Sequence, residues 1–500
     1  MAQPRPIREV VVAGGGIVAW SAAAALRRQL PNLGVTVVSS RPPADALAER
    51  VGSTLPSIVA FHGDLGLSEM NAVARTGSSY RLGTLFEGWA GERPAYVHSY
   101  GEHGRPFGAT SFHLYWMRAA QDGGAGPFDA YSPAAELARA GRFVHPQDEP
   151  GSPLSSFEYG LQLNPPRYHE LMRAYALHLG AQERPSEIAG VELRGEDGFV
   201  AGLRLDDGSL LGGDLFVDCT GPAARIRSVL DGRFEDWSRN LLCDRVLFAE
   251  SVPPADLPVT DRAAAMPSGW RWQADCPART SHGFVYSSAH LSDSKAERAL
   301  RVHSAAEPSA AAVAIRPGRR PEPWLRNCVA IGDSAVAVEP LEWTNLHLAH
   351  SGIDRIVAMM PDAGCAAVEL AEFNRQSAAE AERVRDFLML HYVTALRPEP
   401  FWRDAAAAPI PDSLAHTLHL FRERGRLPFH EEETFARDSW LNVLLGHGVM
   451  PNRIDPLTEA VPAARAQAAM TQMRDGIRTL VQTLPPHAAY LGNMMRQAAR

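Results

Sequence analysis

A glycine-rich turn near the start of the chain is the first feature whose residues could do chemistry. Gly14, Gly16 and Ala19 form the pattern GxGxxA between a β-branched run at 8–13 and a helix-forming run at 17–30. Glycines in such a turn let backbone N–H groups approach a pyrophosphate, and the N-terminus of the following helix attracts its charge. The spacing predicts a dinucleotide site, although an ordinary glycine-rich turn of an α/β fold would look the same.

The end of the second predicted strand, at 34–40, bears on how a dinucleotide would be held. This strand completes a βαβ unit with the run at 8–13, which implies a parallel pair. An acidic residue is usual at its end, where the carboxylate binds a ribose hydroxyl. Ser39 and Ser40 stand there instead. A serine hydroxyl can make the same hydrogen bond without charge assistance, so we expect both serines to contact the ribose.

Two later strand-to-glycine turns favour FAD over a nicotinamide as the dinucleotide. Asp333 lies in IGDSA, directly after a buried apolar run that begins at residue 327. Many FAD-binding folds place an aspartate there, near the ribitol of the flavin. The stretch DLFVDCTGP, 214–222, is a further strand that ends in a glycine turn. Together with the early glycine turn, this order of elements predicts an FAD-binding α/β module.

Motifs spread over nearly the whole chain resemble those of the flavin-dependent tryptophan halogenases. The opening GGGIVAW is similar to the first motif of that family, with Trp20 kept and Ala19 in place of a glycine. VGSTLP, 51–56, is similar to a flavin-contacting segment of the family, although the family's glutamate is missing. The resemblance implies cofactor contacts from three residues of this segment: Thr54, Leu55 and Pro56. Further similar stretches are GWRWQADCP at 269–277, GDSAVAVEPLEWTNLHLAHSGI at 332–353 and SWLNVLLGHGVMP at 439–451.

The resemblance also implies a reaction and its reagents. Reduced FAD, delivered by a separate flavin reductase, would react with oxygen, and chloride or bromide would be oxidised to hypohalous acid. This oxidant would pass through an internal tunnel to a lysine beside a small aromatic, indole-like substrate, where a glutamate assists. Two tryptophans would separate the flavin from the substrate and suppress direct oxygen transfer.

The motif EPLEWTN contains the residues that match the halide side of this chemistry. Glu342 matches the assisting glutamate, although a surface carboxylate that caps a turn would fit the same sequence. Thr344 and Asn345 match the positions whose backbone holds the halide in the family, and Leu346 follows them on the cofactor side. The family often has serine at the position of Trp343 and glycine at the position of the asparagine.

The tryptophan pair of the family has its match in GWRWQADCP, at Trp270 and Trp272. The closing Ile-Pro of the family's motif is absent, and Ala274 and Asp275 stand in its place. The alternative is that both tryptophans are core aromatics on alternating faces of a strand, with no part in catalysis.

The relay lysine of the family is the main departure. In SSYRLGTLFEGW, 78–89, counting back from Trp89 places Arg81 at the lysine position. A neutral amine can attack hypochlorous acid, whereas guanidinium stays protonated and delocalised. Arg81 can still hold and polarise hypohalous acid through hydrogen bonds.

No other lysine can take over this role from nearby sequence. Lys295 is the only lysine of the chain and lies in HLSDSKAERA, a polar helical stretch that predicts a solvated surface. Compositional drift in an arginine-rich chain would also explain Arg81 without any function. If the position is the relay site, the sequence predicts that Arg81→Lys raises halogenation.

Two groups of aromatic and histidine residues are candidates for other sites. His113, Tyr115 and Trp116 lie close together in SFHLYWMR, which either lines an aromatic substrate pocket or forms a buried strand. His347 and His350 are three apart on a predicted helix, a spacing that suits a metal, but no third ligand is evident. We expect packed or hydrogen-bonded histidines there, and no metal site.

Composition and charge argue against several classes of protein. Apolar residues make up 45% and charged residues 21% of the chain, which is typical of a soluble globular protein. The formal net charge of −8 argues against nucleic-acid binding. No apolar run reaches membrane-spanning length and the start lacks a secretory apolar core, so we expect a cytoplasmic protein without membrane contact. The five scattered cysteines predict reduced, mostly buried thiols.

The predicted fold is α/β, with a Rossmann-like FAD-binding module, a mixed sheet and a largely helical remainder. Because 500 residues exceed one ordinary core, we expect the module to span 1–360 discontinuously. Substrate-side segments at about 60–160 and 235–320 would be inserted into it, and a helical C-terminal region, 361–500, would pack on it. The oligomeric state is open, with a homodimer as one option.

These features favour an FAD-dependent oxidoreductase of the tryptophan halogenase family, which would halogenate an aromatic, indole-like substrate. One alternative is a flavin-dependent monooxygenase that hydroxylates its substrate without halide, since guanidinium cannot relay the oxidant covalently. A second alternative is a flavin-binding protein without turnover, which the residues found at Ser39, Gly52 and Arg81 would suit.

Overall fold

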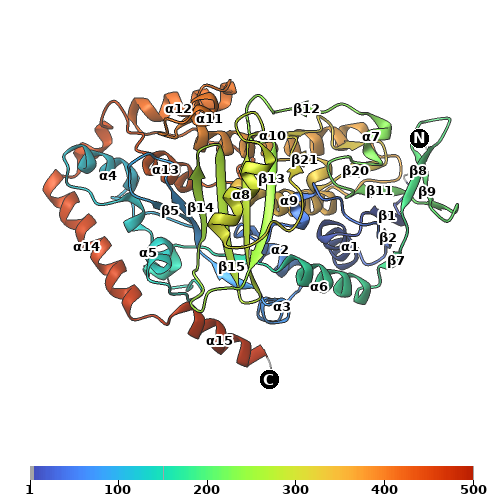
Figure 1. Ribbon diagram of the computed structural model, residues 1–500, viewed down its shortest axis with the longest axis horizontal. Helices are drawn as coiled ribbons and strands as arrows, with labels where there is room; N and C mark the ends of the chain where they lie inside the picture. Colours follow the sequence, from blue (N-terminus) through green and yellow to red (C-terminus); the bar gives the residue numbers. More distant parts are fainter. Residues whose placement is uncertain (1–4, 150, 499–500) are drawn as a thin grey trace. The chain divides into compact units, whose positions relative to one another are not determined.

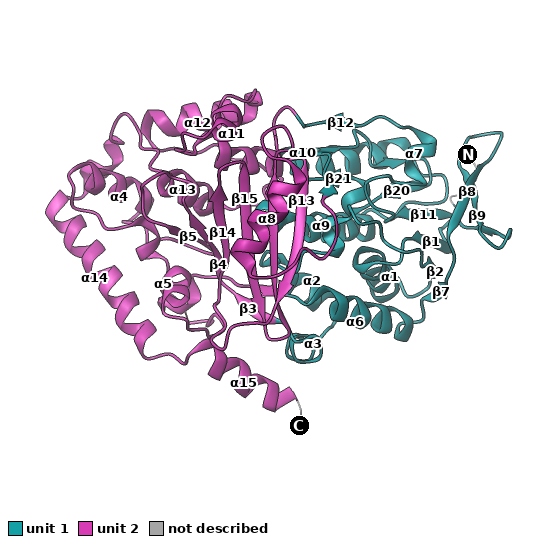
Figure 2. Cartoon of the chain, viewed as in Figure 1, with its two compact units in different colours: residues 1–78, 163–238, 313–382 teal, residues 79–162, 239–312, 383–500 magenta. Residues whose placement is uncertain are grey.

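The computed structural model describes residues 5–149 and 151–498 (Figure 1). The chain forms two compact units, each assembled from separate segments of the sequence (Figure 2). Unit 1 consists of 1–78, 163–238 and 313–382, and unit 2 of 79–162, 239–312 and 383–500. Two segments of unit 2 are therefore inserted into unit 1 in sequence, and the C-terminal residues from 383 onward cluster with these insertions instead of forming a region of their own.

Unit 1 is built on a six-stranded mixed sheet with the strand order β19-β20-β11-β1-β2-β7. The strands are β1 (Glu9–Ala13), β2 (Gly34–Val38), β7 (Gln182–Arg184), β11 (Leu215–Asp218), β19 (Trp324–Leu325) and β20 (Cys328–Ala330). β1 pairs in parallel with both β2 and β11, whereas the edge pair β19–β20 is antiparallel. The carboxyl ends of β1, β2 and β11 therefore meet at one edge of the sheet, where open α/β sheets bind their ligands.

Helix α1 (Ile17–Gln29) connects β1 to β2, as the sequence predicts, and is buried from Ile17 to Leu26. It packs against α6 (Pro165–His178) and α9 (Thr344–Ala358). The other helices that begin in unit 1 are α2 (Ser57–Leu65), α3 (Glu69–Thr76), α7 (Arg227–Leu230) and α10 (Ala367–Val393). Three short 3-10 turns matter for the site: η1 (Leu47–Glu49), η4 (Gly332–Ser334) and η5 (Leu341–Trp343).

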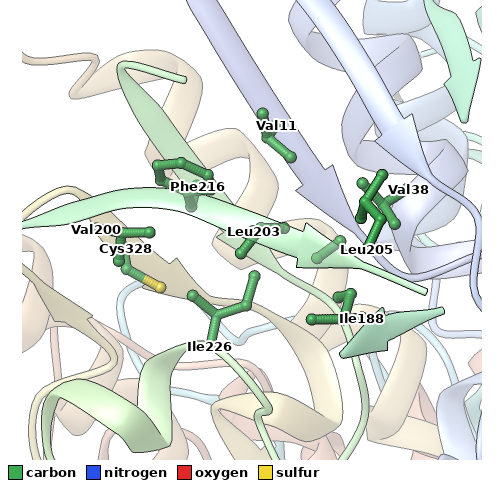
Figure 3. Packing of buried hydrophobic residues seen from close by; sticks show 10 residues of the cluster. Val11, Val38, Ile188, Val200, Leu203, Leu205, Phe216, Ile226 and Cys328 are labelled. Carbon is green, nitrogen blue, oxygen red and sulfur yellow. The ribbon is translucent and has the colours of Figure 1, made fainter. Parts of the chain in front are cut away.

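The hydrophobic core of unit 1 continues onto a small antiparallel sheet of β8 (Ile188–Leu193), β9 (Val200–Leu205) and β10 (Leu210–Gly212). Figure 3 shows the side chains that pack between this sheet and the main one: Val11, Val38, Ile188, Val200, Leu203, Leu205, Phe216, Ile226 and Cys328. Full burial of one such aliphatic side chain stabilises the fold by about 1.5–3 kcal/mol. The cluster therefore holds the small sheet against the main sheet, in which the glycine turn follows β1.

Unit 2 contains a sheet in which β13, β16, β15, β14, β4 and β5 follow one another. Their bounds are β4 (Gly83–Glu87), β5 (Tyr96–Ser99), β13 (Arg245–Ser251), β14 (Asp261–Met266), β15 (Gly269–Cys276) and β16 (Arg279–Tyr286). β14 and β4 pair in parallel, with Asp261 opposite Thr84. A separate antiparallel pair joins β3 (Ser79–Arg81) to β6 (Gly160–Gln162), so position 81 is the last residue of a short strand.

The remaining residues of unit 2 are largely helical. Its helices are α4 (Phe112–Gln121), α5 (Pro133–Arg139), α8 (Asp293–Ser304), α11 (Pro400–Ala406), α12 (Asp412–Arg424), α13 (Arg437–Gly446), α14 (Ala463–Gln482) and α15 (His487–Ala498). Lys295 is exposed on α8, as the sequence predicts. All five cysteines of the chain are buried. Within the described ranges, no helix combines the length and apolar character needed to span a bilayer.

Candidate active site

The turn between β1 and α1 brings the main chains of three strands together. Gly14 has a φ of +126°, and a Cβ there would lie 2.5 Å from the carbonyl oxygen of Cys219, just after β11. The Gly14 N–H donates to the carbonyl of Val38, at the end of β2, over 3.0 Å. A side chain could not be accommodated, which explains the first glycine of the motif. Ala19 and Trp20, further along α1, are buried in unit 1.

A half-buried carboxylate is hydrogen-bonded to the amides at the N-terminus of α1. Glu49, at the end of η1, accepts hydrogen bonds from the backbone N–H groups of Ile17 and Val18, the latter over 3.1 Å. A Cβ at Gly16 would lie within 2.2 Å of this carboxylate. Burial raises the pKa of Glu49 to about 7, although the two hydrogen bonds act to lower it. These amides therefore hold an anion, and the carboxylate stands in for the pyrophosphate of a dinucleotide such as FAD.

Asp333 lies against the same segment. Its Oδ2 accepts a hydrogen bond of 2.9 Å from the backbone N–H of Ala48. Burial raises the pKa of Asp333 to about 7, and the nearby negative charge of Glu49 raises it further. The half-buried Glu49 and the buried Asp333 thus share one polar region beside the start of α1, which is the region where a flavin dinucleotide would be bound.

The cofactor-free protein is expected to lose stability as the pH rises from about 4 to about 7. Glu49 and Asp333 have pKa values of about 7 in the folded protein, above the value of about 4 usual in an unfolded chain. The folded protein keeps protons that the unfolded chain has released, so this contribution is complete below about pH 4 and lost through about pH 7. For either acid alone it amounts to about 4 kcal/mol. Thermal unfolding at about pH 5 and about pH 8 measures it, and Glu49→Gln should shrink the difference; an unchanged difference would contradict the assignment.

The residues predicted to contact the ribose and the flavin belong to unit 1. Ser39 and Ser40 follow β2, and Ser40 is buried. The Ser39 side chain is hydrogen-bonded to Glu183 on β7, whose pKa is lowered mainly by its hydrogen bond with Arg173. A charged acid therefore lies beside the serines, although it comes from a different strand than the usual motif predicts. The segment before α2 contains three further predicted contacts, buried or half-buried: Thr54, Leu55 and Pro56.

The turn before α9 holds a buried acid on a strained backbone. Glu342 has φ 61° and ψ 8°, and Trp343 has φ 63° and ψ 34°. Holding a residue other than glycine in this left-handed region costs about 1–3 kcal/mol, and such outliers gather at functional sites. The Glu342 side chain is only 2% exposed. The alternative of a surface carboxylate is therefore wrong, because the turn points this acid into the protein.

Helix α9 begins with a buried hydroxyl group. Thr344 is its first residue and is fully buried, and its Oγ1 has no hydrogen-bond partner within the described protein. The Asn345 side chain donates a hydrogen bond of 2.9 Å to the carbonyl of Val338, which fastens the preceding turn. Leu346 is buried beside them. Because a helix N-terminus carries partial positive charge, this end of α9 is suited to a small anion.

Arg81 lies in unit 2 in a closed polar environment. Its guanidinium forms an ion pair of 2.7 Å with Asp261, and both side chains are buried. It also donates hydrogen bonds to Thr84 Oγ1 over 2.9 Å and to the carbonyl of Gly83 over 3.2 Å. A further hydrogen bond joins it to the hydroxyl of Tyr100. Burying an arginine is costly unless it is paired, so the fold has provided specific partners for this side chain.

Trp270 and Trp272 lie on the same face of β15, with ring centroids 5.9 Å apart and both side chains buried. The alternative that they occupy alternating faces is wrong, because residues two apart on a strand point to the same side. Trp270 also contacts Trp89, with ring centroids 6.3 Å apart. Gly283 on the neighbouring strand leaves room for Trp272, since a Cβ there would lie 1.9 Å from its ring. The two indole rings are therefore held close to each other in the interior of unit 2.

The stretch SFHLYWMR forms helix α4, so the alternative of a buried strand is wrong. Its buried aromatic residues recur at helical spacing, which the short run did not distinguish from a strand. His113 Nε2 lies 3.0 Å from the carbonyl of Gly425, and the side chains of Tyr115 and Trp116 also donate to backbone carbonyls of unit 2. Their contact with a substrate stays a prediction.

The two histidines of α9 have partners within unit 1. His347 Nδ1 lies 2.8 Å from the Ser57 hydroxyl, and its Nε2 lies 3.3 Å from a carboxylate oxygen of Glu380. The ring of His350 stacks on Phe61 with centroids 3.7 Å apart. His347 is hydrogen-bonded and His350 is packed against an aromatic ring, so each fits the expectation of packed or hydrogen-bonded histidines. In the part of the chain that the structure describes, no group of three or more His, Cys, Asp or Glu residues is arranged to hold a metal ion.

Comparisons with known proteins give one consistent result. The sequence profile of the family described as tryptophan halogenase matches residues 9–463. Tryptophan 6-halogenase SttH of Streptomyces toxytricini is 30% identical over 530 residues, which cover 97% of this chain and 98% of that protein. The solved structure of BrvH, a flavin-dependent halogenase from Brevundimonas sp. BAL3, is 38% identical with a TM-score of 0.92 and covers 98% of this chain and 99% of its own. That of Xcc4156, a flavin-dependent halogenase from Xanthomonas campestris, is 34% identical with a TM-score of 0.91 over the same shares.

Proposed function

Because the chain belongs to the tryptophan halogenase family, we propose that it is a flavin-dependent halogenase that acts on a small aromatic, indole-like substrate. Reduced FAD, oxygen and chloride or bromide are its reagents, and a separate flavin reductase supplies the reduced cofactor. We propose that the protein acts in the cytoplasm. A homodimer is compatible with it but is not required.

The observation that carries the proposal is the strained turn at the start of α9. It holds the Glu342 carboxylate in a buried position and places the unpartnered Thr344 hydroxyl at a helix N-terminus. A halide is a small anion, and it would be held there by Thr344 and Asn345. Glu342 is then the group that takes or gives a proton near the halide chemistry. The combination of a buried acid and an anion site supports halogenation over simple flavin binding.

The cofactor side follows from the residues around β1 and α1. The amides that Glu49 occupies would hold the pyrophosphate of FAD once this carboxylate has moved away. The remaining contacts would come from other residues of unit 1: Gly14, Gly16, Ala19, Trp20, Ser39, Ser40, Thr54, Leu55, Pro56, Asp333 and Leu346. FAD, when bound, supplies the oxidising chemistry. The protein's part is to bind it and to exclude water.

Unit 2 provides the residues proposed for oxidant and substrate. The Arg81 guanidinium would hold hypohalous acid by hydrogen bonds, since it cannot form a stable bond to halogen as a neutral amine can. Trp270 and Trp272 would form the wall that keeps the flavin from direct reaction with the substrate. We propose that the aromatic substrate is contacted in this unit by His113, Tyr115 and Trp116.

A reconstituted reaction tests this function. The purified protein is incubated with FAD, a flavin reductase, NADH, oxygen, bromide or chloride and a panel of indoles, and products are identified by mass spectrometry. The expected result is incorporation of halogen that depends on halide, flavin and reductase together. A protein that binds flavin but leaves every indole unchanged would contradict the proposal and favour a non-catalytic flavin-binding role.

A monooxygenase that hydroxylates its substrate is the second candidate. The observation that favours it is the charged, ion-paired state of Arg81, which removes the covalent route for the oxidant. In the same assay it predicts products that carry one added oxygen atom and form equally well without halide. Loss of all product when halide is omitted would exclude it.

A further inference from the structure

A buried carboxylate accompanies the arginine at position 81. The terminal nitrogen of Arg81 lies 2.7 Å from Oδ2 of Asp261, and the two side chains are 1% and 2% exposed. Solvent therefore does not screen this pair, and each charge strongly favours the charged form of the other. No motif in the sequence pointed to Asp261.

The sheet of unit 2 fixes the geometry of this pair. The parallel pairing of β14 with β4 sets Asp261 opposite Thr84. The N–H of Leu82 donates to the carbonyl of Val259 over 2.6 Å, which ties the chain before β4 to the chain before β14. A Cβ at Gly83 would lie 2.1 Å from the carbonyl of His98, so the backbone beside Arg81 is closely packed. The carboxylate therefore faces position 81 because of strand register, whichever side chain stands there.

We propose that Asp261 is a positioning residue that orients the guanidinium of Arg81 and would keep a lysine at the same position charged, so that the side chain at position 81 acts as a hydrogen-bond donor and not as a nitrogen nucleophile. The proposal rests on the proposed function in one respect, the assignment of position 81 to the delivery of hypohalous acid. The titratable groups in contact with Arg81 include Asp261 on β14 and Tyr100, which follows β5.

The chemistry depends on an electron pair. A neutral amine forms a chloramine when its nitrogen lone pair attacks chlorine: the N–Cl bond forms, the Cl–O bond breaks, and the departing hydroxide takes the amine proton to give water. A nitrogen kept cationic by an adjacent carboxylate has no lone pair to donate. Guanidinium N–H groups can instead hold the oxygen of hypohalous acid through charge-assisted hydrogen bonds.

Arg81→Lys alone is therefore expected not to raise halogenation, contrary to the expectation from sequence. The new ammonium group would inherit the Asp261 carboxylate and stay protonated. When Asp261→Asn is combined with Arg81→Lys, the lysine is buried without its counter-ion and gives up its proton more readily. A gain in halogenation is expected for the double variant only.

The single lysine of the chain allows a direct measurement of this charge. In a Lys295→Arg background, Arg81→Lys leaves one lysine, and carbon-13 labelling of lysine gives one NMR signal that reports its protonation in the full-length protein with FAD added. With Asp261 present the signal is expected to stay that of an ammonium group up to about pH 10. With Asp261→Asn its titration midpoint should fall by more than about one pH unit, and Asp261→Glu should restore it. Equal midpoints with and without the carboxylate would overturn the proposal.

A matched control is the buried carboxylate of Asp129, which pairs with Arg139 in the same unit. Asp129→Asn should leave the titration midpoint of the lysine at position 81 unchanged. If Asp261→Asn does not fold, as judged by circular dichroism, Asp261→Ser replaces it in every arm, and the same comparison of midpoints decides.

Halogenation by these variants separates the two proposals. The double variant is expected to be at least about tenfold faster than the single variant, since a tenfold rate change needs a barrier change of only about 1.4 kcal/mol. A difference in NMR midpoints in a protein that halogenates nothing would sink the proposed function and leave the role of Asp261 standing. Equal midpoints in an active halogenase would overturn the role of Asp261 and leave the proposed function standing.

Discussion

Glu342→Gln should lower the rate of halogenation by about 100-fold or more, with little change in flavin affinity. A positioned acid or base contributes about 10²- to 10⁴-fold to a reaction, and glutamine has nearly the same shape but cannot take up the proton. The side chain at this position is 2% exposed, so the substitution removes a charge without exposing or filling space. Product formed per minute with reductase-supplied flavin gives the rate, and quenching of FAD fluorescence gives the affinity.

Glu339→Gln is the matched control for this prediction. Glu339 is 1% exposed and precedes the same turn, but no catalytic role is assigned to it. This variant is expected to keep most of its activity. If both variants lost activity equally, the buried charge of the turn, and not proton transfer at position 342, would be the cause.

Glu49→Gln should tighten FAD binding by about ten- to a hundredfold at about pH 8. The Glu49 carboxylate occupies the Ile17 and Val18 amides that a pyrophosphate needs. Hydrogen bonds to a charged group contribute about 1.5–3 kcal/mol, and each 1.4 kcal/mol corresponds to a factor of about ten in affinity. Removing the competing charge should therefore make the free energy of FAD binding more favourable by an amount of that order. Titration with FAD, followed by fluorescence quenching, measures the change.

The effect of the Glu49 charge on FAD affinity should also appear as a pH dependence of FAD binding. The pKa of Glu49 is raised to about 7 by burial, so the carboxyl group is protonated below that pH and competes less with a phosphate. The wild-type protein should bind FAD more tightly at about pH 6 than at about pH 8, and Glu49→Gln should flatten this dependence. Glu9→Gln, at the exposed first residue of β1, serves as the control and should change neither. Weaker binding by Glu49→Gln would mean that the carboxylate organises the cofactor site and does not obstruct it.

The cofactor side of the fold could be predicted because its signals are local. Gly14 and the apolar runs on either side of it specify a strand, a tight turn and a helix within a short stretch, and the structure has β1, α1 and β2 there. The fold class followed from the order of these turns along the chain. The same kind of local signal failed for α4, because a short run of buried aromatic residues fits both a strand and a helix.

Partners that the fold supplies from a distance could not be predicted. Glu49 lies 32 residues from Ile17, and nothing between them marks a carboxylate that returns to the helix. Asp261 meets Arg81 only because β14 pairs with β4. The left-handed backbone at Glu342 and Trp343 has no sequence signature either, since neither residue is glycine. In each case long-range packing decides a local geometry.

The exposed lysine on α8 has a practical consequence for handling this protein. Lys295 is the only lysine in a chain that otherwise uses arginine, and its side chain faces solvent. Guanidinium groups stay protonated and do not react with the aldehydes or activated esters used to attach proteins to solid supports. Apart from coupling through the α-amino group, every molecule would be tethered through the same side chain, so an immobilised preparation would have one uniform orientation.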